Sequence, residues 1–110
     1  MAEKLVIDLA ANYESEKIYF GNHRGNVDEF AVNVSWSGAT TSGGTIEVIT
    51  YFDENEAEAY DVLGTILINA ATGRETVFGD IDIDAIKIKY TKVTSAVGTA
   101  NVFVRLTSRD

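Results

Sequence analysis

The amino-acid sequence predicts an all-β fold, namely a single β-sandwich of about seven to eight antiparallel strands. Apolar and polar residues alternate with a period of two along several segments. Clusters of Gly, Asn, Ser and Thr separate these segments, as turns do. No segment shows the 3.6-residue periodicity of an amphipathic helix. The 110 residues fit one domain spanning 1–110, and two topologies stay open, a jelly roll and an Ig-like sandwich.

The first half of the chain begins with two short apolar runs, residues 4–9 and 16–20. A turn rich in Gly and Asn follows at 21–26. The alternation is clear over residues 28–36, which predicts a half-buried strand. Its inward face is expected to carry Phe30, Val32, Val34 and Trp36.

A polar loop at 37–44 leads to a strand at 45–52 that is rich in β-branched and aromatic residues. Both faces of this strand are partly apolar, because Ile49 and Tyr51 lie opposite the face of Ile46 and Val48. This predicts either a central strand covered on both sides or an exposed apolar patch. The next segment, 53–61, contains five acidic residues and is interpreted as a solvated loop.

The second half predicts four further strand segments, at 63–70, 75–78, 81–92 and 100–107. A turn at Thr72-Gly73 precedes the short segment 75–78, which is expected at a sheet edge. The alternation slips in phase at Asp84-Ala85, which predicts a bend or a β-bulge. The inward residues of the last two segments are expected to be Ile86, Ile88, Tyr90, Val102, Val104 and Leu106.

The composition excludes several classes of function. The chain has no Cys, a single His and a net charge of −8. Disulfides, thiolate metal sites and thiol nucleophiles are therefore absent, and nucleic-acid binding is disfavoured because it depends on Lys and Arg neutralising phosphates. No nucleotide-binding or nucleophile-elbow motif is present. We expect a protein that is not an enzyme, carries no cofactor and binds neither nucleic acid nor membrane.

Three alternating aspartates, Asp80, Asp82 and Asp84, form a candidate metal site, since hard cations such as Ca²⁺ take several oxygen ligands. The match to an EF-hand loop fails downstream, where Ala85 and Thr91 stand in place of Gly and Glu. The alternation with isoleucines also explains the aspartates as the solvated side of a strand. A calcium-dependent adhesive domain remains an alternative.

A second alternative is a glycan-binding module, because exposed aromatic rings can stack on sugars. The candidate stacking residues are Trp36, Tyr51 and Tyr60. The position of Trp36 in its alternating strand favours the core over such a platform.

The order of strands and turns resembles that of small virion-associated proteins of tailed bacteriophages. The stretches that carry the resemblance are VSWSGATTSGGTIEVITYFD, LGTILINAATGRETVFGDIDIDAIKIKYTKV and GTANVFVRLTSR, and the resemblance spans about residues 28–107. The resemblance implies a β-sandwich, often trimeric, that serves as a capsid decoration, head-fibre or tail accessory protein. It implies a structural role in the virion, after synthesis in the host cytoplasm.

Such a role would use protein–protein surfaces. The apolar residues expected to be exposed, Ile49, Tyr51 and Phe103, are the candidate interface. The expected partners are copies of the chain itself, in a homo-oligomer such as a trimer, and a capsid or tail protein.

Overall fold

The computed structural model of the chain describes residues 2–20, 27–39, 44–51, 61–80 and 85–108. Within these ranges the chain forms nine strands and no helix, and therefore no helix suited to crossing a membrane. The strands are β1 (Ala2–Asp8), β2 (Tyr13–Glu14), β3 (Ile18–Tyr19), β4 (Val27–Ser37), β5 (Gly44–Tyr51), β6 (Asp61–Ile68), β7 (Gly73–Asp80), β8 (Ala85–Thr91) and β9 (Thr99–Ser108).

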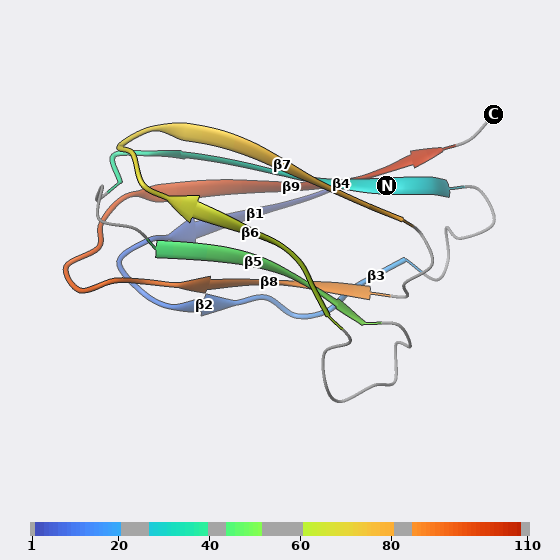
Figure 1. The fold of residues 1–110 in the computed structure, drawn as a ribbon, viewed down its shortest axis with the longest axis horizontal. Coiled ribbons are helices and arrows are strands. Elements are labelled where there is room, and N and C mark those ends of the chain that lie inside the picture. The colour runs from blue at the N-terminus through green and yellow to red at the C-terminus, as the bar shows by residue number, and fades with distance from the viewer. Residues whose placement is uncertain (1, 21–26, 40–43, 52–60, 81–84, 109–110) are drawn as a thin grey trace.

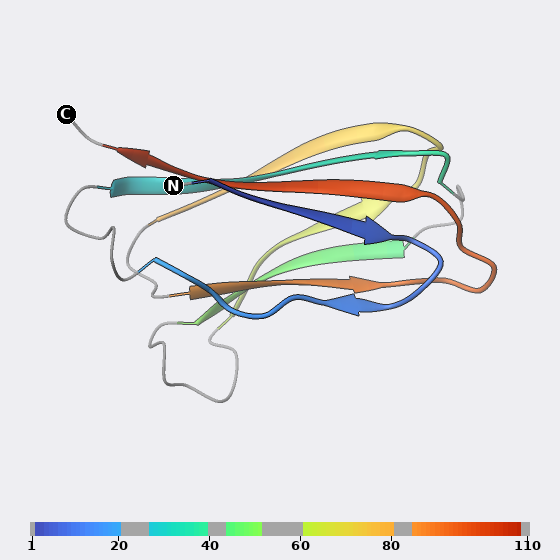
Figure 2. The same ribbon diagram turned by 180° about the vertical axis from the view of Figure 1, so that it is seen from behind.

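The strands form two antiparallel sheets that pack face to face (Figure 1). One sheet has the order β1-β9-β4-β7, and the other has the order β2-β8-β5-β6, with β3 also paired to β8. Figure 2, from behind, shows β2 and β3 following one another along β8. The predicted β-sandwich is confirmed.

The strand pairing selects the jelly roll over the Ig-like topology. Strands from the two ends of the chain pair first, β1 with β9, and the pairing then moves inward through β2 and β3 with β8, β4 with β7, and β5 with β6. A long antiparallel hairpin of nested pairs, rolled into two sheets, is the plan of a jelly roll. Because nested pairs join residues far apart in sequence, each sheet combines both halves of the chain.

The core lies between the inner faces of the two sheets. Alternate residues of each long strand are buried, since successive side chains of a strand point to opposite faces. The predicted inward faces of β4, β8 and β9 are confirmed: Phe30, Val32, Val34, Trp36, Ile86, Ile88, Tyr90, Val102, Val104 and Leu106 are all buried. The rings of Phe20 and Phe30 pack at 4.9 Å between centroids.

Strand β7 is longer than the predicted segment 75–78, and Gly73 begins it rather than forming a turn. In register, Gly73 lies opposite Trp36 and Gly79 lies opposite Phe30. A Cβ at either glycine would collide with the facing aromatic ring. These two glycines therefore make room for the two largest side chains of β4, which explains why residues with low strand propensity lie within this strand.

The phase slip at Asp84-Ala85 marks a change of sheet. Strand β7 ends at Asp80 in the four-stranded sheet, and β8 begins at Ala85 in the other sheet. The predicted break at Asp84-Ala85 agrees with a long strand that begins at Ala85 in the other sheet, whereas the short segment predicted before it, at 81–84, lies outside the described residues. Whether Ile81 and Ile83 are buried lies outside the described residues.

The edge beside β8 is interrupted between β2 and β3, and Ser15 bridges the interruption. Its backbone N–H donates to the carbonyl of Ile88 at 2.9 Å. Its Oγ accepts a hydrogen bond from the Ile88 N–H, also at 2.9 Å, in a buried position. The serine hydroxyl thus replaces a backbone acceptor, which lets the strand break without leaving a buried donor unpaired.

Replacing Ser15 with alanine removes the acceptor for the buried N–H of Ile88. We expect Ser15→Ala to lower the free energy of unfolding by roughly 1–3 kcal/mol, the cost of an unsatisfied buried polar group. Urea denaturation measures this, with Ser35→Ala, on an outer face, as the matched control. Equal stability of the two variants would show that the Ser15 hydroxyl does not hold this edge.

Glu14 and Lys87 form an ion pair on the outer face of the second sheet, with 2.9 Å between Oε2 and Nζ. The hydrogen bond and the positive charge of Lys87 lower the pKa of Glu14. A carboxyl group whose pKa is lower in the folded than in the unfolded state stabilises the fold at pH values above its unfolded-state pKa. This contribution is lost as the pH falls through the folded-state pKa.

Replacing Lys87 with methionine removes the partner of Glu14. Carboxyl titration by NMR should therefore show Glu14 ionising at lower pH in the native chain than in Lys87→Met, and identical midpoints would contradict the pairing.

Candidate functional site

The outer face of the β1-β9-β4-β7 sheet carries an ordered grid of side chains. The register aligns one outward residue from each strand into a row that crosses the sheet. Three successive rows are Arg105–Ala31–Phe78, Lys4–Phe103–Asn33–Thr76 and Val6–Asn101–Ser35–Arg74. We call these three rows the grid.

All charges in the grid are positive, although the chain has a net charge of −8. Lys4, Arg74 and Arg105 supply them, whereas the rows that flank the grid on the same face contain Asp8 at one end and Glu29 at the other. Within the described part of the chain, neither arginine forms an ion pair. The Nζ of Lys4 lies 5.4 Å from the centroid of the Phe103 ring, within the range of a cation–π contact.

Exposed apolar side chains lie among these cations. Phe78 is 63% exposed, Phe103 is 43% exposed and Val6 is 60% exposed. Scattered apolar residues on a surface are ordinary, but aromatic rings interleaved with arginines on one sheet face are typical of protein interaction surfaces.

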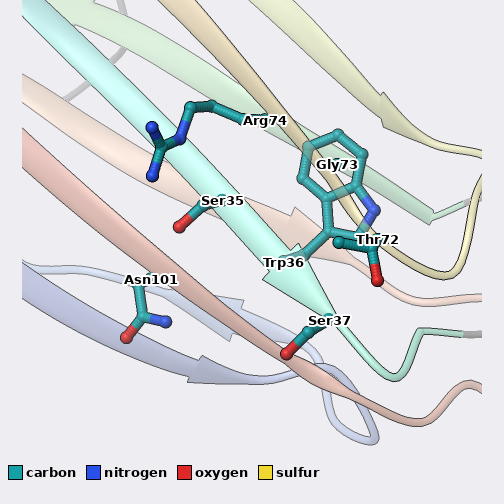
Figure 3. Close-up of a pocket in the computed structure, with 7 residues that line it drawn as sticks. All are labelled: Ser35, Trp36, Ser37, Thr72, Gly73, Arg74 and Asn101. Carbon is teal, nitrogen blue, oxygen red and sulfur yellow. The ribbon is translucent and has the colours of Figure 1, made fainter.

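Two shallow hollows indent the grid, and Arg74 lines both. One lies over Ala31, Asn33, Phe78 and Phe103, where the Asn33 amide donates to the Thr76 hydroxyl at 2.7 Å. The other lies beside the start of β7, and Figure 3 shows Arg74, Ser35 and Asn101, from three neighbouring strands, along it. The hollows are open surfaces that suit contact with a partner.

The predicted interface residues lie on two different sheets. Phe103 belongs to the grid, but Ile49 and Tyr51 lie on β5 in the other sheet. Ile49 is half-buried, and Tyr51 is only 5% exposed. The ammonium of Lys17 lies 4.4 Å from the centroid of the Tyr51 ring, and that of Lys87 lies 6.0 Å from it. The expectation of an exposed Tyr51 was wrong, since the residue is buried and two lysine ammonium groups lie within cation–π distance of its ring.

The candidate stacking residues do not form a common platform. Trp36 is 6% exposed, and its indole N–H donates to the carbonyl of Ala70 at 3.0 Å. Trp36 lies in the four-stranded sheet and Tyr51 in the other sheet, whereas Tyr60 lies outside the described residues. The indole is part of the core, as its place in the alternation predicted, and Trp36 also lines the second hollow.

The candidate metal site falls mostly outside the described residues. Asp80 ends β7 and pairs in register with Glu29, but Asp82 and Asp84 lie beyond the described strands. Among the residues that the structure describes, no three His or acidic side chains are grouped closely enough to hold a metal ion. The calcium hypothesis stays a prediction.

Sequence reasoning missed Arg74, Thr76 and Phe78 as members of a surface. The signal was the alternation of GRETVFGD, in which these three residues share one face of an eight-residue strand. The interpretation of Gly73 as a turn residue shortened the segment and removed Arg74 from it.

Comparison with known proteins gives matches in structure only. No protein-family model matches the chain, and no curated protein matches its sequence. The crystal structure of the SPBc2 prophage-derived protein YomS superposes with a TM-score of 0.50 at 17% identity, covering 96% of each chain. At this identity the similarity establishes the fold.

Two other solved structures are similar at lower scores. A protein of Bacillus endospore appendages, described as disulfide-linked pili, has a TM-score of 0.49 at 16% identity, over 99% of this chain and 88% of the other. A structure described under CBM4 structure and function has a TM-score of 0.46 at 12% identity, over 89% and 61% of the two chains.

The burial of Trp36 under Gly73 can be tested by fluorescence, because Trp36 is the only Trp in the chain. We expect weak acrylamide quenching of the native protein. Gly73→Ala should alter the emission and lower the stability by roughly 1–3 kcal/mol, since the added methyl overpacks the ring. Thr72→Ala, at the exposed neighbouring residue, is the control, and quenching as efficient as in the unfolded chain would contradict the buried position.

Proposed function

We propose that the protein is a structural, non-catalytic component of a bacteriophage virion, such as a capsid decoration protein or a head or tail accessory protein. It acts through protein–protein surfaces, and its proposed partners are copies of itself and a capsid or tail protein. The observation that carries the proposal is the grid, where exposed Phe78 and Phe103 line a hollow together with Arg74 and Arg105.

The composition of the grid supports a protein partner. Aromatic residues and arginine are enriched at protein interfaces, while acidic residues are depleted. The flat, open shape of a sheet face also suits a broad partner surface better than a small molecule, which usually binds in a deep cleft.

The fold supports the virion as the setting. The jelly roll is a recurrent architecture of viral capsid and lectin domains, and the prophage-derived protein YomS shares the fold over nearly the whole chain. The resemblance of residues 28–107 to virion-associated phage proteins points the same way. The glycan-binding alternative lacks a common stacking platform of Trp36 and Tyr51, because the two residues are buried on different sheets.

The proposal is tested on phage particles from a host that carries the gene. We expect mass spectrometry of density-purified particles to find the chain in many copies per particle, with a non-structural protein of the same phage as the negative control. Its presence in the lysate together with its absence from purified particles would contradict the proposal.

A further inference from the structure

Strand β6 is an edge strand that carries no charge over most of its length. Among the described strands it pairs with β5 only. After Asp61, residues 62–68 contain neither a charged residue nor a proline. Val62 and Leu67 are exposed, the latter to 50%. A long, uncharged edge strand with exposed apolar side chains is a site at which another strand readily pairs.

The other edges of the two sheets are protected against such pairing. Strand β1 contains Glu3 and Lys4. Strand β7 contains Arg74 and Glu75. The edge that β2 and β3 form along β8 is interrupted between these two strands and contains Glu14. Charges and interruptions are features by which sheets avoid edge-to-edge pairing, so β6 is the edge of the described sheets that is open to a further strand.

The pairing of β8 determines which backbone groups of β5 point toward β6. On one side of β8, Ile88 exchanges hydrogen bonds with Ser15. Successive residues of an antiparallel strand direct their N–H and C=O groups to opposite sides, so Lys89 points toward β5, where it lies opposite Glu47. The backbone groups of Ile46, the residue before Glu47, therefore point toward β6.

The side of β6 away from β5 presents the backbone groups of Thr65 and Leu67. Ile46 lies opposite Ile66, so Ile66 directs its N–H and C=O toward β5, and the residues on either side of it direct theirs away from β5. The register with β5 shifts before residue 64. A further strand can therefore join β6 over residues 64–68.

A second copy of β6 fits this edge in one antiparallel register. With a two-fold axis at Ile66, Thr65 of each copy lies opposite Leu67 of the other, because a two-fold contact uses the same residues on both sides. Each residue then meets a partner whose N–H and C=O point toward it. An axis at Thr65 or at Leu67 would place that residue opposite itself and the other one opposite a residue outside 64–68.

This register brings no like charges together. On the outer face, the neighbour of Thr65 within its own sheet is Glu47. Across the contact come Leu67 and, beyond it, Thr45 of the second copy, and neither is charged. On the inner face the two Ile66 side chains adjoin, so the core of one copy continues into the core of the other. The chain has a net charge of −8, so copies repel one another in general, and an uncharged edge is where this repulsion is least.

We propose that two copies of this chain join through their β6 edges, antiparallel about a two-fold axis at Ile66, and form one sheet that is continuous across both copies. The inference rests on the proposed structural function and adds the contact through which copies of the chain meet. Because β6 belongs to the sheet that does not carry the grid, this contact is separate from the grid.

Sedimentation equilibrium in high salt tests the contact, because salt screens the charges of the grid but leaves pairing of an uncharged edge in place. We expect the native chain to form dimers. Thr65→Pro removes an N–H that donates across the contact and should weaken dimerisation by about tenfold or more. The matched control is Thr65→Val, which keeps the N–H and a β-branched side chain and should stay within about twofold. Leu67→Lys, which places a charge on the edge, is a second weakening variant, and thermal melts verify that each variant is folded.

Disulfide trapping tests the register. The chain has no Cys, so Thr65→Cys and Leu67→Cys each carry one thiol. Residues of a hydrogen-bonded antiparallel pair lie about 5.5 Å apart at Cα, which a disulfide can span. When the two variants are mixed and mildly oxidised, we expect mass spectrometry of the linked peptides to find mainly disulfides between positions 65 and 67.

Three results would overturn the inference: a native chain that stays monomeric at high concentration in high salt, dimerisation that neither Thr65→Pro nor Leu67→Lys weakens, or a predominance of disulfides that join position 65 to itself or position 67 to itself. None of these bears on whether the chain is found in particles. A chain that is present in virions and monomeric in solution would overturn the pairing of copies, leave the proposed function standing and point to a strand of another virion protein as the occupant of the edge.

Discussion

The fold depends on burying one face of each sheet against the other. The central residues of this layer, Val32, Val104 and Val48, have no exposed surface. Because side chains alternate along a strand, a shift of one residue would send every buried side chain to solvent. The register is therefore strongly fixed, and with it the residues that point outward. The grid is the reverse side of this core: Phe103 is exposed because Val102 and Val104 are buried.

The margins of the core are completed by small and polar residues. Gly73 and Gly79 leave space for aromatic rings from the neighbouring strand, and Ser15 supplies an acceptor where the edge strand breaks. Tyr90 likewise places a polar group at the margin of the core without leaving it unpaired. Its ring lies in the core, and its hydroxyl donates to the carbonyl of Leu9 at 2.8 Å. Burial raises the pKa of Tyr90, consistent with a hydroxyl that stays protonated to make this bond.

The sequence predicts the sandwich and most inward faces because alternation is local. Phe30, Val32, Val34 and Trp36 follow one another at alternate positions, so a single strand reveals its own buried side. The burial of Tyr51 was missed because Lys17, whose ammonium lies over its ring, belongs to a distant part of the chain. The grid was missed for the same reason: Lys4, Arg74 and Arg105 become neighbours only through the pairing of β1, β9, β4 and β7. Strand pairing between distant segments is a property of the fold that periodicity within one segment does not contain.

We propose that the outer face of the β1-β9-β4-β7 sheet is a contact surface, and cysteine labelling tests this directly. The chain has no native Cys, so a Thr76→Cys variant carries one thiol, within the grid. Its rate of alkylation can be measured across a range of protein concentrations, with Thr65→Cys on the other sheet as a second reporter. We expect labelling at position 76 to slow as the chain associates and to recover in high salt. A rate at position 76 that stays constant while the chain associates would contradict it.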